Sequence, residues 1–250
     1  MILKHFSINE INISKSYEVG INKIKRLPKL EKFMIIFWLL GPFIYLIERT
    51  PADIWLTLLA ITFLAKSFCT KDWSWANQTW FKFAIALWIT GLISSLISPY
   101  PFFTFSQGFV WIRFPLYAVA VQTWLARDRD IRILMLISIF LGMLIMCFIL
   151  CAELFFAPLD YQGLSKTRLT WPYGDLTPGG YLSKVSLPLF CILVAITVNR
   201  FSKVSGFYGL VALFSLIMLF LTGERTNSIL RICSGIMAAF FWKPKYLAIA

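Results

Sequence analysis

Long apolar segments, separated by short polar ones, run the length of the chain. We find eight of them, at residues 33–47, 54–69, 83–98, 103–126, 131–157, 181–199, 206–222 and 227–242. A helix needs about 20 apolar residues to cross a bilayer without tilting, and several of these segments are shorter than that. The pattern predicts an all-α, polytopic integral membrane protein with about eight transmembrane helices. Within the first segment, Gly41-Pro42 predicts a kink.

Composition agrees with a membrane location. The chain has 250 residues, of which 59% are hydrophobic and 14% charged, and its mean hydropathy is +0.74. A soluble domain is nearer 45–50% apolar and about 25% charged. The net charge of +12 does not indicate a nucleic-acid partner, because the basic residues are scattered through short loops and form no basic groove interleaved with aromatic residues.

The distribution of lysine and arginine predicts the topology. Seventeen basic residues lie in or next to the N-terminal tail, the even-numbered loops and the chain's end, whereas six lie in or near the odd-numbered loops, and Arg113 lies within a segment. Because cytoplasmic loops are enriched in basic residues, we expect the N-terminus and the even-numbered loops in the cytoplasm. The loop 158–180, between the fifth and sixth segments, and the turn Gly223–Asn227 then face outward together.

These features divide the chain into four parts. Residues 1–32 form a basic cytoplasmic tail without the apolar core of a signal peptide. Residues 33–157 contain the first five membrane helices, 158–180 the outward-facing loop, and 181–250 three further helices. The end, "KPKYLAIA", begins a new apolar run, so we expect the chain to be an N-terminal portion of a longer protein.

Arg113 is the most unusual charged residue within a segment. It is the eleventh residue of the segment 103–126, about 15 Å along a helix. An arginine at that depth costs at least about 3 kcal/mol unless it is paired or hydrated. Two interpretations stay open. One is a structural ion pair, for which Glu153 is one candidate partner, or a side chain that snorkels to the interface; the other is a residue that lines a water-filled cavity for an anionic headgroup. Pro115 adds a helix irregularity nearby.

The outward turn "TGERTN" is a candidate anion site. The arginine fork of Arg225 suits phosphate oxygens, and the start of the following helix also favours an anion. The simpler interpretation is a capped turn in which Glu224 neighbours Arg225. We interpret Arg231 as a side chain that snorkels to the outer interface.

The outward loop offers a second set of basic residues. Lys166 and Arg168 carry positive charge in a stretch rich in Gly, Pro, Asp and Thr, which is typical of a folded loop. The alternatives are an ordinary surface loop and a loop that captures a phosphate or sugar headgroup.

Metal and cofactor sites are not indicated. The five cysteines form no CxxC, and the one histidine, His5, lies in the tail. We therefore predict no metal site, no cofactor and no disulfide framework.

Two of these stretches together resemble a known family. "RLTWPYGDLTPGGYLSKVSLPLF" (168–190) and "LFLTGERTN" (219–227) resemble the loop and the Thr/Ser-Gly-x-Arg turn of O-antigen ligases and related O-antigen polymerases, in order, spacing and outward side. The resemblance covers roughly 160–240.

The resemblance implies a glycosyltransferase of surface polysaccharide or lipopolysaccharide assembly in a bacterial inner membrane, with the loop 158–180 as a periplasmic loop. Such an enzyme moves a glycan from an undecaprenyl diphosphate carrier to a hydroxyl of a glycan, of lipid A-core or of a protein, with inversion and without a metal. By the same resemblance, Arg225 and Arg168 bind the diphosphate. From the residues themselves we add Arg113, Glu224 and Lys166 as candidate supporting residues. The family's histidine base has no counterpart among these residues, so we name no general base.

Three other functions remain open at this stage. The first is a transporter or flippase for an anionic lipid or solute, with Arg113 as its intramembrane site. The second, within the same class of chemistry, is an O-antigen polymerase or a protein O-oligosaccharyltransferase. The third is a structural membrane subunit. The absence of an internal repeat and the outward position of the charges favour the transferase over the transporter.

Overall fold

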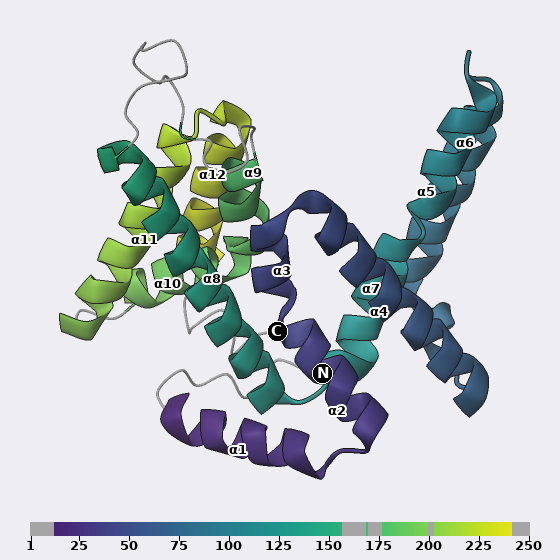
Figure 1. Ribbon diagram of the computed structural model, residues 1–250, viewed down its shortest axis with the longest axis horizontal. Coiled ribbons are helices and arrows are strands. Elements are labelled where there is room, and N and C mark those ends of the chain that lie inside the picture. Colours follow the sequence, from purple (N-terminus) through teal and green to yellow (C-terminus); the bar gives the residue numbers. More distant parts are fainter. Residues whose placement is uncertain (1–12, 157–168, 170–176, 200–202, 242–250) are drawn as a thin grey trace. The chain divides into compact units, whose positions relative to one another are not determined.

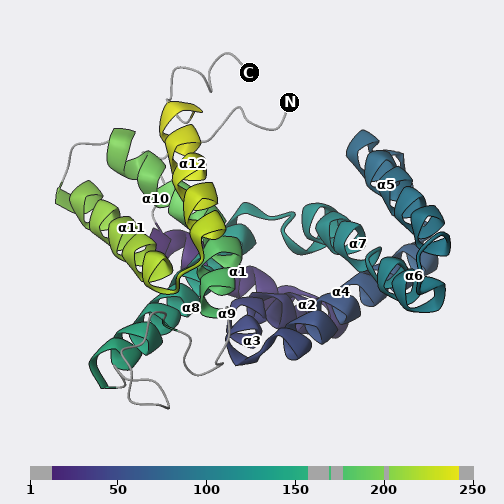
Figure 2. The ribbon, with the colours of Figure 1, turned by 90° about the horizontal axis from the view of Figure 1, so that it is seen from above.

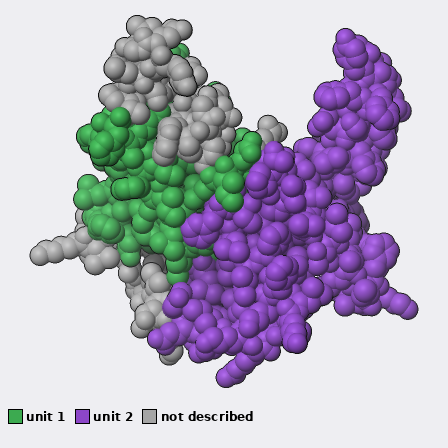
Figure 3. Space-filling view, in the orientation of Figure 1, with its two compact units in different colours: residues 1–16, 45–48, 135–250 green, residues 17–44, 49–134 purple. Residues whose placement is uncertain are grey.

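The computed structural model describes residues 13–156, 169, 177–199 and 203–241, and every regular element in these ranges is a helix (Figure 1). The all-α class predicted from the sequence is therefore confirmed. The chain divides into two compact units, coloured separately in Figure 3. Unit 1 comprises residues 1–16, 45–48 and 135–250, and unit 2 comprises residues 17–44 and 49–134.

Unit 2 contains the first membrane-type helices. Its helices are α1 (Ile13–Arg26, from Tyr17 onward), α2 (Lys29–Leu39), the first part of α3 (Gly41–Ile47), α4 (Arg49–Thr70), α5 (Thr79–Leu96), α6 (Pro101–Val110), α7 (Arg113–Ala120) and the start of α8 (Arg129–Phe156). A short 3-10 turn (Ser74–Asn77) precedes α5, and a π-helical turn (Val121–Leu125) follows α7.

Indole and ammonium groups tie the helices of unit 2 together. Trp55 of α4 donates from Nε1 to the carbonyl of Phe37 in α2 at 2.7 Å. Toward the C-terminal end of α4, Lys66 Nζ donates to Glu31 Oε1 of α2 at 2.6 Å. The Trp88 indole of α5 reaches the carbonyl of Gly108 in α6 at 2.9 Å, which fastens the two helices into a hairpin. Each bond satisfies a polar atom that lipid could not.

Unit 1 is built on the rest of α8 and four later helices. These are α9 (Thr177–Gly180), which runs into a π-helical turn (Tyr181–Val185), then α10 (Leu187–Asn199), α11 (Lys203–Leu221) and α12 (Arg225–Phe241). Helices α10, α11 and α12 pack side by side, as Figure 2 shows from above. The core of the unit consists of fully buried side chains, among them Met146, Leu150, Leu182 and Leu219.

Three described helices are long and apolar enough to cross a membrane: Thr50–Thr70, Thr79–Leu96 and Arg129–Phe156. Two bent pairs raise the number to five when each pair counts as one span. These helices coincide with predicted segments of the chain. Among the remaining segments, the apolar stretch of α11, Ser205–Leu221, is only 17 residues long, and α12 contains two arginines.

The bend in the first segment confirms the predicted kink. Helices α2 and α3 meet at Leu40 with a bend of 50°, directly before Gly41-Pro42. The physical reason is that Pro42 has no N–H to donate to the carbonyl four residues earlier, and its ring clashes with that carbonyl.

The fourth segment, predicted as one helix over 103–126, is broken. Helix α6 ends at Val110 and α7 begins at Arg113. Between them the N–H of Trp111 donates to the carbonyl of Gly108, three residues earlier, at 3.2 Å, which is the hydrogen-bond spacing of a 3-10 helix. Pro115 explains the break, because it withholds the N–H that the carbonyl of Trp111 would otherwise accept. Hydropathy cannot detect this break, since the segment 103–126 stays apolar on average in spite of Arg113.

Candidate functional site at the Thr222–Arg225 turn

The turn between α11 and α12 is tightly closed. Thr222 is buried, and its hydroxyl donates to the carbonyl of Leu219 at 2.7 Å. Gly223 has a φ of 76°, the left-handed conformation in which glycine pays no steric penalty, and its N–H donates to Phe220 at 3.0 Å. This is how a helix commonly ends, and it lets α12 begin two residues later.

Helix α12 presents Arg225 at its first position. The Arg225 side chain is exposed, while Ser228 donates from both N–H and Oγ to the carbonyl of Glu224, at 3.0 and 2.9 Å. The first N–H groups of a helix lack partners inside it, and the helix dipole disfavours a positive charge there. An anion bound at this end would satisfy the N–H groups and neutralise Arg225 at the same time.

The glycine-bearing start of α9 lies directly on this turn. A Cβ placed at Gly179 would come within 2.6 Å of Thr222 Oγ1 and 2.9 Å of Glu224 Cδ. Only glycine leaves room for so close an approach. The carboxylate end of Glu224 is thereby held against α9, whereas the space beside Gly180 is open.

A third segment reaches the same place from the outward loop. The N–H of Leu169, itself buried, donates to the carbonyl of Leu221 at 3.0 Å. Residues 169, 177–180 and 221–225 therefore meet, although about 40 to 55 positions separate the first two from the third along the chain. These are parts of the two motifs that carry the family resemblance. The candidate residues Lys166 and Arg168 lie outside the described residues.

Arg231 corrects one expectation from the sequence. We predicted a side chain that snorkels outward, but Arg231 is completely buried. Its guanidinium donates to the carbonyl of Leu182 at 2.6 Å and to Ser215 Oγ at 3.0 Å, and it lies 4.4 Å from the centre of the Phe190 ring. The reason is that α12 turns this position toward the core of unit 1, where a helix break supplies a carbonyl acceptor.

That helix break is the second bent pair. Residues Pro178–Val185 and Leu187–Val198 meet at Ser186 with a bend of 58°. Ser186 Oγ donates back to the carbonyl of Leu182 at 2.6 Å, so this carbonyl accepts from both Ser186 and Arg231. The bend and the α12 helix are thus joined by one shared acceptor.

Arg113 belongs to unit 2 and forms the structural ion pair that the sequence left open. Its Nη2 contacts Asp53 Oδ1 at 2.8 Å, and its Nη1 contacts Thr57 Oγ1 at 3.4 Å. Both partners belong to α4, one helical turn apart. Sequence reasoning considered Glu153 as a partner and overlooked Asp53. Glu153 belongs to unit 1 and is buried there.

The described residues hold no group of three or more His, Cys, Asp or Glu side chains arranged to bind a metal ion. The Thr222–Arg225 turn itself offers three features: the exposed guanidinium of Arg225, the start of α12, and the Glu224 carboxylate beside Gly179. Comparisons of the chain with protein families, with curated proteins and with solved structures found no match.

Proposed function

We propose that the protein transfers a glycan from an undecaprenyl diphosphate carrier to an acceptor hydroxyl at the periplasmic face of the bacterial inner membrane. One observation carries the proposal: the described parts of the two motifs that together resemble O-antigen ligases, residues 169 and 177–180 of one and 221–225 of the other, come together in space. Leu169 bonds Leu221 at 3.0 Å, Gly179 lies on Thr222 and Glu224, and Arg225 is exposed beside them.

The chemistry suits a diphosphate. In the proposed reaction, the bond between the anomeric carbon and the diphosphate oxygen breaks, and its electron pair leaves with the diphosphate. The acceptor oxygen forms the new bond from the opposite face and loses its proton to a general base. Arg225 and the N–H groups at the start of α12 stabilise the charge that develops on the leaving group.

The topology proposed from the sequence places this site outward. With the N-terminus in the cytoplasm and eight crossings, the Thr222–Arg225 turn and the loop 158–180 share the periplasmic side. The acceptor is a hydroxyl of a glycan, of lipid A-core or of a protein, and supplying each in turn to the same donor distinguishes ligase, polymerase and protein transferase.

Arg225→Ala tests the proposal in the full-length protein. We expect glycan transfer to fall by about 10²-fold or more, as when a single anion-stabilising donor is lost. Arg225→Lys, which keeps the charge but lacks the planar fork, should retain part of the activity. Lys184→Ala removes another exposed cation of unit 1 and serves as the control. Transfer that is equal in all three variants, at equal membrane levels, would refute the diphosphate role.

A second function is favoured by one feature, the 58° bend between Pro178–Val185 and Leu187–Val198. Broken helices of this kind build substrate sites in transporters, so a flippase for an anionic lipid is the alternative. Proteoliposomes loaded with a labelled diphosphate-linked glycan separate the two functions. Release of free carrier diphosphate with a glycosylated acceptor supports transfer, whereas movement of intact donor across the bilayer supports the flippase.

A further inference from the structure

Helix α1 is amphipathic and turns its apolar face toward its own unit. Ile24 and Gly20, four residues apart, are buried, while Glu18, Asn22 and Lys25 on the other side are exposed. A Cβ at Gly20 would lie 3.0 Å from Leu134 Cδ1, so α1 packs directly on the first turns of α8. The outer face of α1 is therefore polar.

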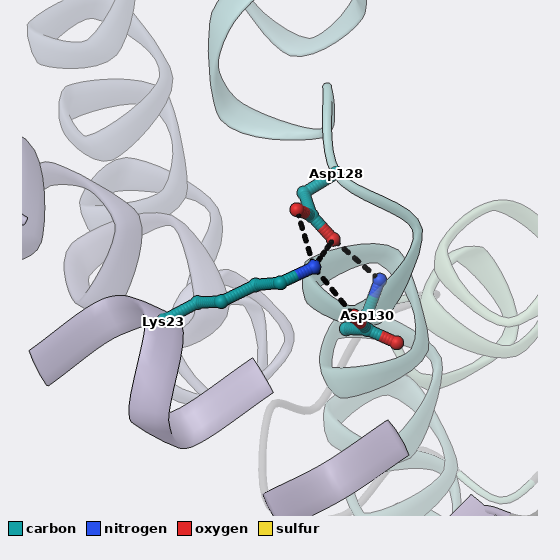
Figure 4. Close-up of polar contacts among 3 residues, drawn as sticks. All are labelled: Lys23, Asp128 and Asp130. Carbon is teal, nitrogen blue, oxygen red and sulfur yellow. Dashed lines mark hydrogen bonds and ion pairs between the residues drawn. The ribbon is translucent and has the colours of Figure 1, made fainter. Parts of the chain in front are cut away.

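An ion-pair cluster fixes this arrangement. Lys23 Nζ bonds Asp128 at 2.7 Å and Asp130 at 2.7 Å, as Figure 4 shows. Asp128 is also the cap of α8, because its Oδ1 accepts the backbone N–H of Asp130 at 2.9 Å, the usual way in which an aspartate satisfies the free N–H groups of a helix start. We call these three side chains the Lys23 clamp.

Basic side chains outnumber acidic ones around the Lys23 clamp, and the clamp pairs both acidic side chains. Residues 23–29 and 127–132 contain seven basic and two acidic side chains, a net charge of +5. Both acidic side chains are engaged by Lys23. The six other basic side chains are all exposed, and we call five of them the basic collar: Lys25, Arg26, Lys29, Arg127 and Arg132.

Two connections hold the collar at the ends of candidate membrane spans. Only Leu27 and Pro28 separate α1 from α2, which forms a bent span with α3, and the clamp attaches α1 to the start of α8, the most apolar span of the described chain. Where these helices enter a bilayer, the collar lies at headgroup depth, within the screening length of about 8 Å at physiological salt. This position favours lipid phosphates over a soluble acidic partner.

We propose that the basic collar binds the headgroups of anionic phospholipids on the cytoplasmic leaflet, and that the Lys23 clamp holds α1 in place for this contact. Each lysine or arginine near an anionic surface adds attraction, and an amphipathic helix in the interface plane is the usual element for such contacts. This inference is independent of the proposed transferase activity.

Native mass spectrometry of the full chain tests it, in mixed micelles that contain equal phosphatidylglycerol and phosphatidylcholine. We expect the wild-type protein to retain phosphatidylglycerol preferentially. Lys25→Gln/Arg26→Gln should lower the ratio of retained phosphatidylglycerol to phosphatidylcholine on the order of tenfold, and raising NaCl from about 0.1 M to about 0.5 M should weaken the wild-type preference.

The matched control is Lys71→Gln/Lys82→Gln, which removes two other exposed lysines of unit 2 and changes the net charge equally. Circular dichroism confirms that both variants are folded. The proposal is overturned if the two double variants lose the same amount of phosphatidylglycerol, or if neither loses any. Co-purification of nucleic acid or an acidic peptide with the wild-type protein, without lipid preference, would assign the collar to that partner instead and equally overturn it.

Discussion

The guanidinium of Arg231 donates a 2.6 Å hydrogen bond to the carbonyl of Leu182, a residue 49 positions earlier in the chain. This bond joins α12, which carries Arg225 at its exposed start, to the bent segment whose first residues lie on the Thr222–Arg225 turn. A buried charge thus holds together the two elements of the candidate site. Buried charges are costly unless their hydrogen bonds are satisfied.

We predict that Arg231→Lys destabilises the protein more than Arg231→Met. Lysine keeps the buried charge but lacks the fork that reaches Leu182 and Ser215 together, so we expect a loss of about 3 kcal/mol. Methionine removes the charge, and the Leu182 carbonyl still accepts from Ser186 at 2.6 Å. Thermal unfolding in detergent measures both variants. A lysine variant as stable as the methionine variant would show that the fork is dispensable.

The two adjacent glycines of α9 offer an internally controlled test of the site. Gly179→Ala would place a Cβ 2.6 Å from Thr222 Oγ1, and since Thr222 is buried and bonded to Leu219, α9 must shift. We expect a loss of about 1–3 kcal/mol of stability, typical of overpacking, together with a loss of the proposed transfer activity.

Gly180→Ala is the control, because nothing lies within 4 Å of the added Cβ. It should unfold at nearly the wild-type temperature and keep its activity. Adding Thr222→Ala to Gly179→Ala removes the closest clash and should recover part of the stability. Equal behaviour of the two single alanine variants would contradict the close packing of α9 on the turn.

Periodicity and hydropathy predicted much of the fold. The kink at Gly41-Pro42 and the helices α4, α5 and α8 follow from residue order alone, because apolar length and proline act locally. The break between α6 and α7 was missed as a break, although Pro115 was noted as an irregularity. Hydropathy averaged over a segment does not change when one residue, here Pro115, lacks a backbone N–H.

The candidate site was predictable only in part. Its residues were found from motif spacing, but the contact of Gly179 with Glu224 and the bond from Leu169 to Leu221 depend on how distant segments pack. The direction of Arg231 was wrong for the same reason. A charge near a helix end resembles a snorkelling side chain until the opposite acceptor, the Leu182 carbonyl, is known. Asp53 was overlooked because the hydropathy pattern placed it just before the segment 54–69, whereas α4 begins at Arg49 and contains it.

The pair formed by Arg113 and Asp53 can be measured by a double-mutant cycle. The side chains are 19% and 35% exposed, so solvent screens the pair in part, and we expect a coupling of about 1 kcal/mol. Asp53→Ala alone leaves the Arg113 charge half-buried and should be the more harmful single change. Thermal unfolding of both single variants and the double variant gives the coupling. A value indistinguishable from zero would mean that Arg113 is stabilised by other contacts.

The Lys23 clamp should respond to pH in two opposite ways. Hydrogen bonds from Lys23 Nζ to Asp128 and Asp130 raise the pKa of Lys23 above its ordinary 10.5. Burial raises the pKa of Asp128, but the hydrogen bonds from Lys23 and from the Asp130 N–H, with the charges of Lys23 and Arg132, outweigh it and leave the pKa below 3.8.

The signs define a window of pH for the attachment of α1. A carboxyl whose pKa is lowered by folding stabilises the folded state at pH values above its ordinary pKa, and this stabilisation is lost as the pH falls through the lowered pKa. An amine whose pKa is raised by folding stabilises the folded state at pH values below its ordinary pKa, and this stabilisation is lost as the pH rises through the raised pKa. We therefore expect α1 to be held firmly between about pH 4 and pH 10 and to loosen outside that range.

Hydrogen–deuterium exchange of α1, corrected for the intrinsic pH dependence of exchange, measures this attachment. Lys23→Gln should raise the exchange of residues 17–26 at neutral pH toward the wild-type level at acid pH, and should flatten the pH dependence. Lys25 lies two residues from Lys23 on the same helix and outside the clamp, so Lys25→Gln is the control and should behave like the wild type. If α1 exchanges equally in the wild type and Lys23→Gln at neutral pH, the clamp does not hold the helix, because apolar packing of Ile24 then suffices by itself.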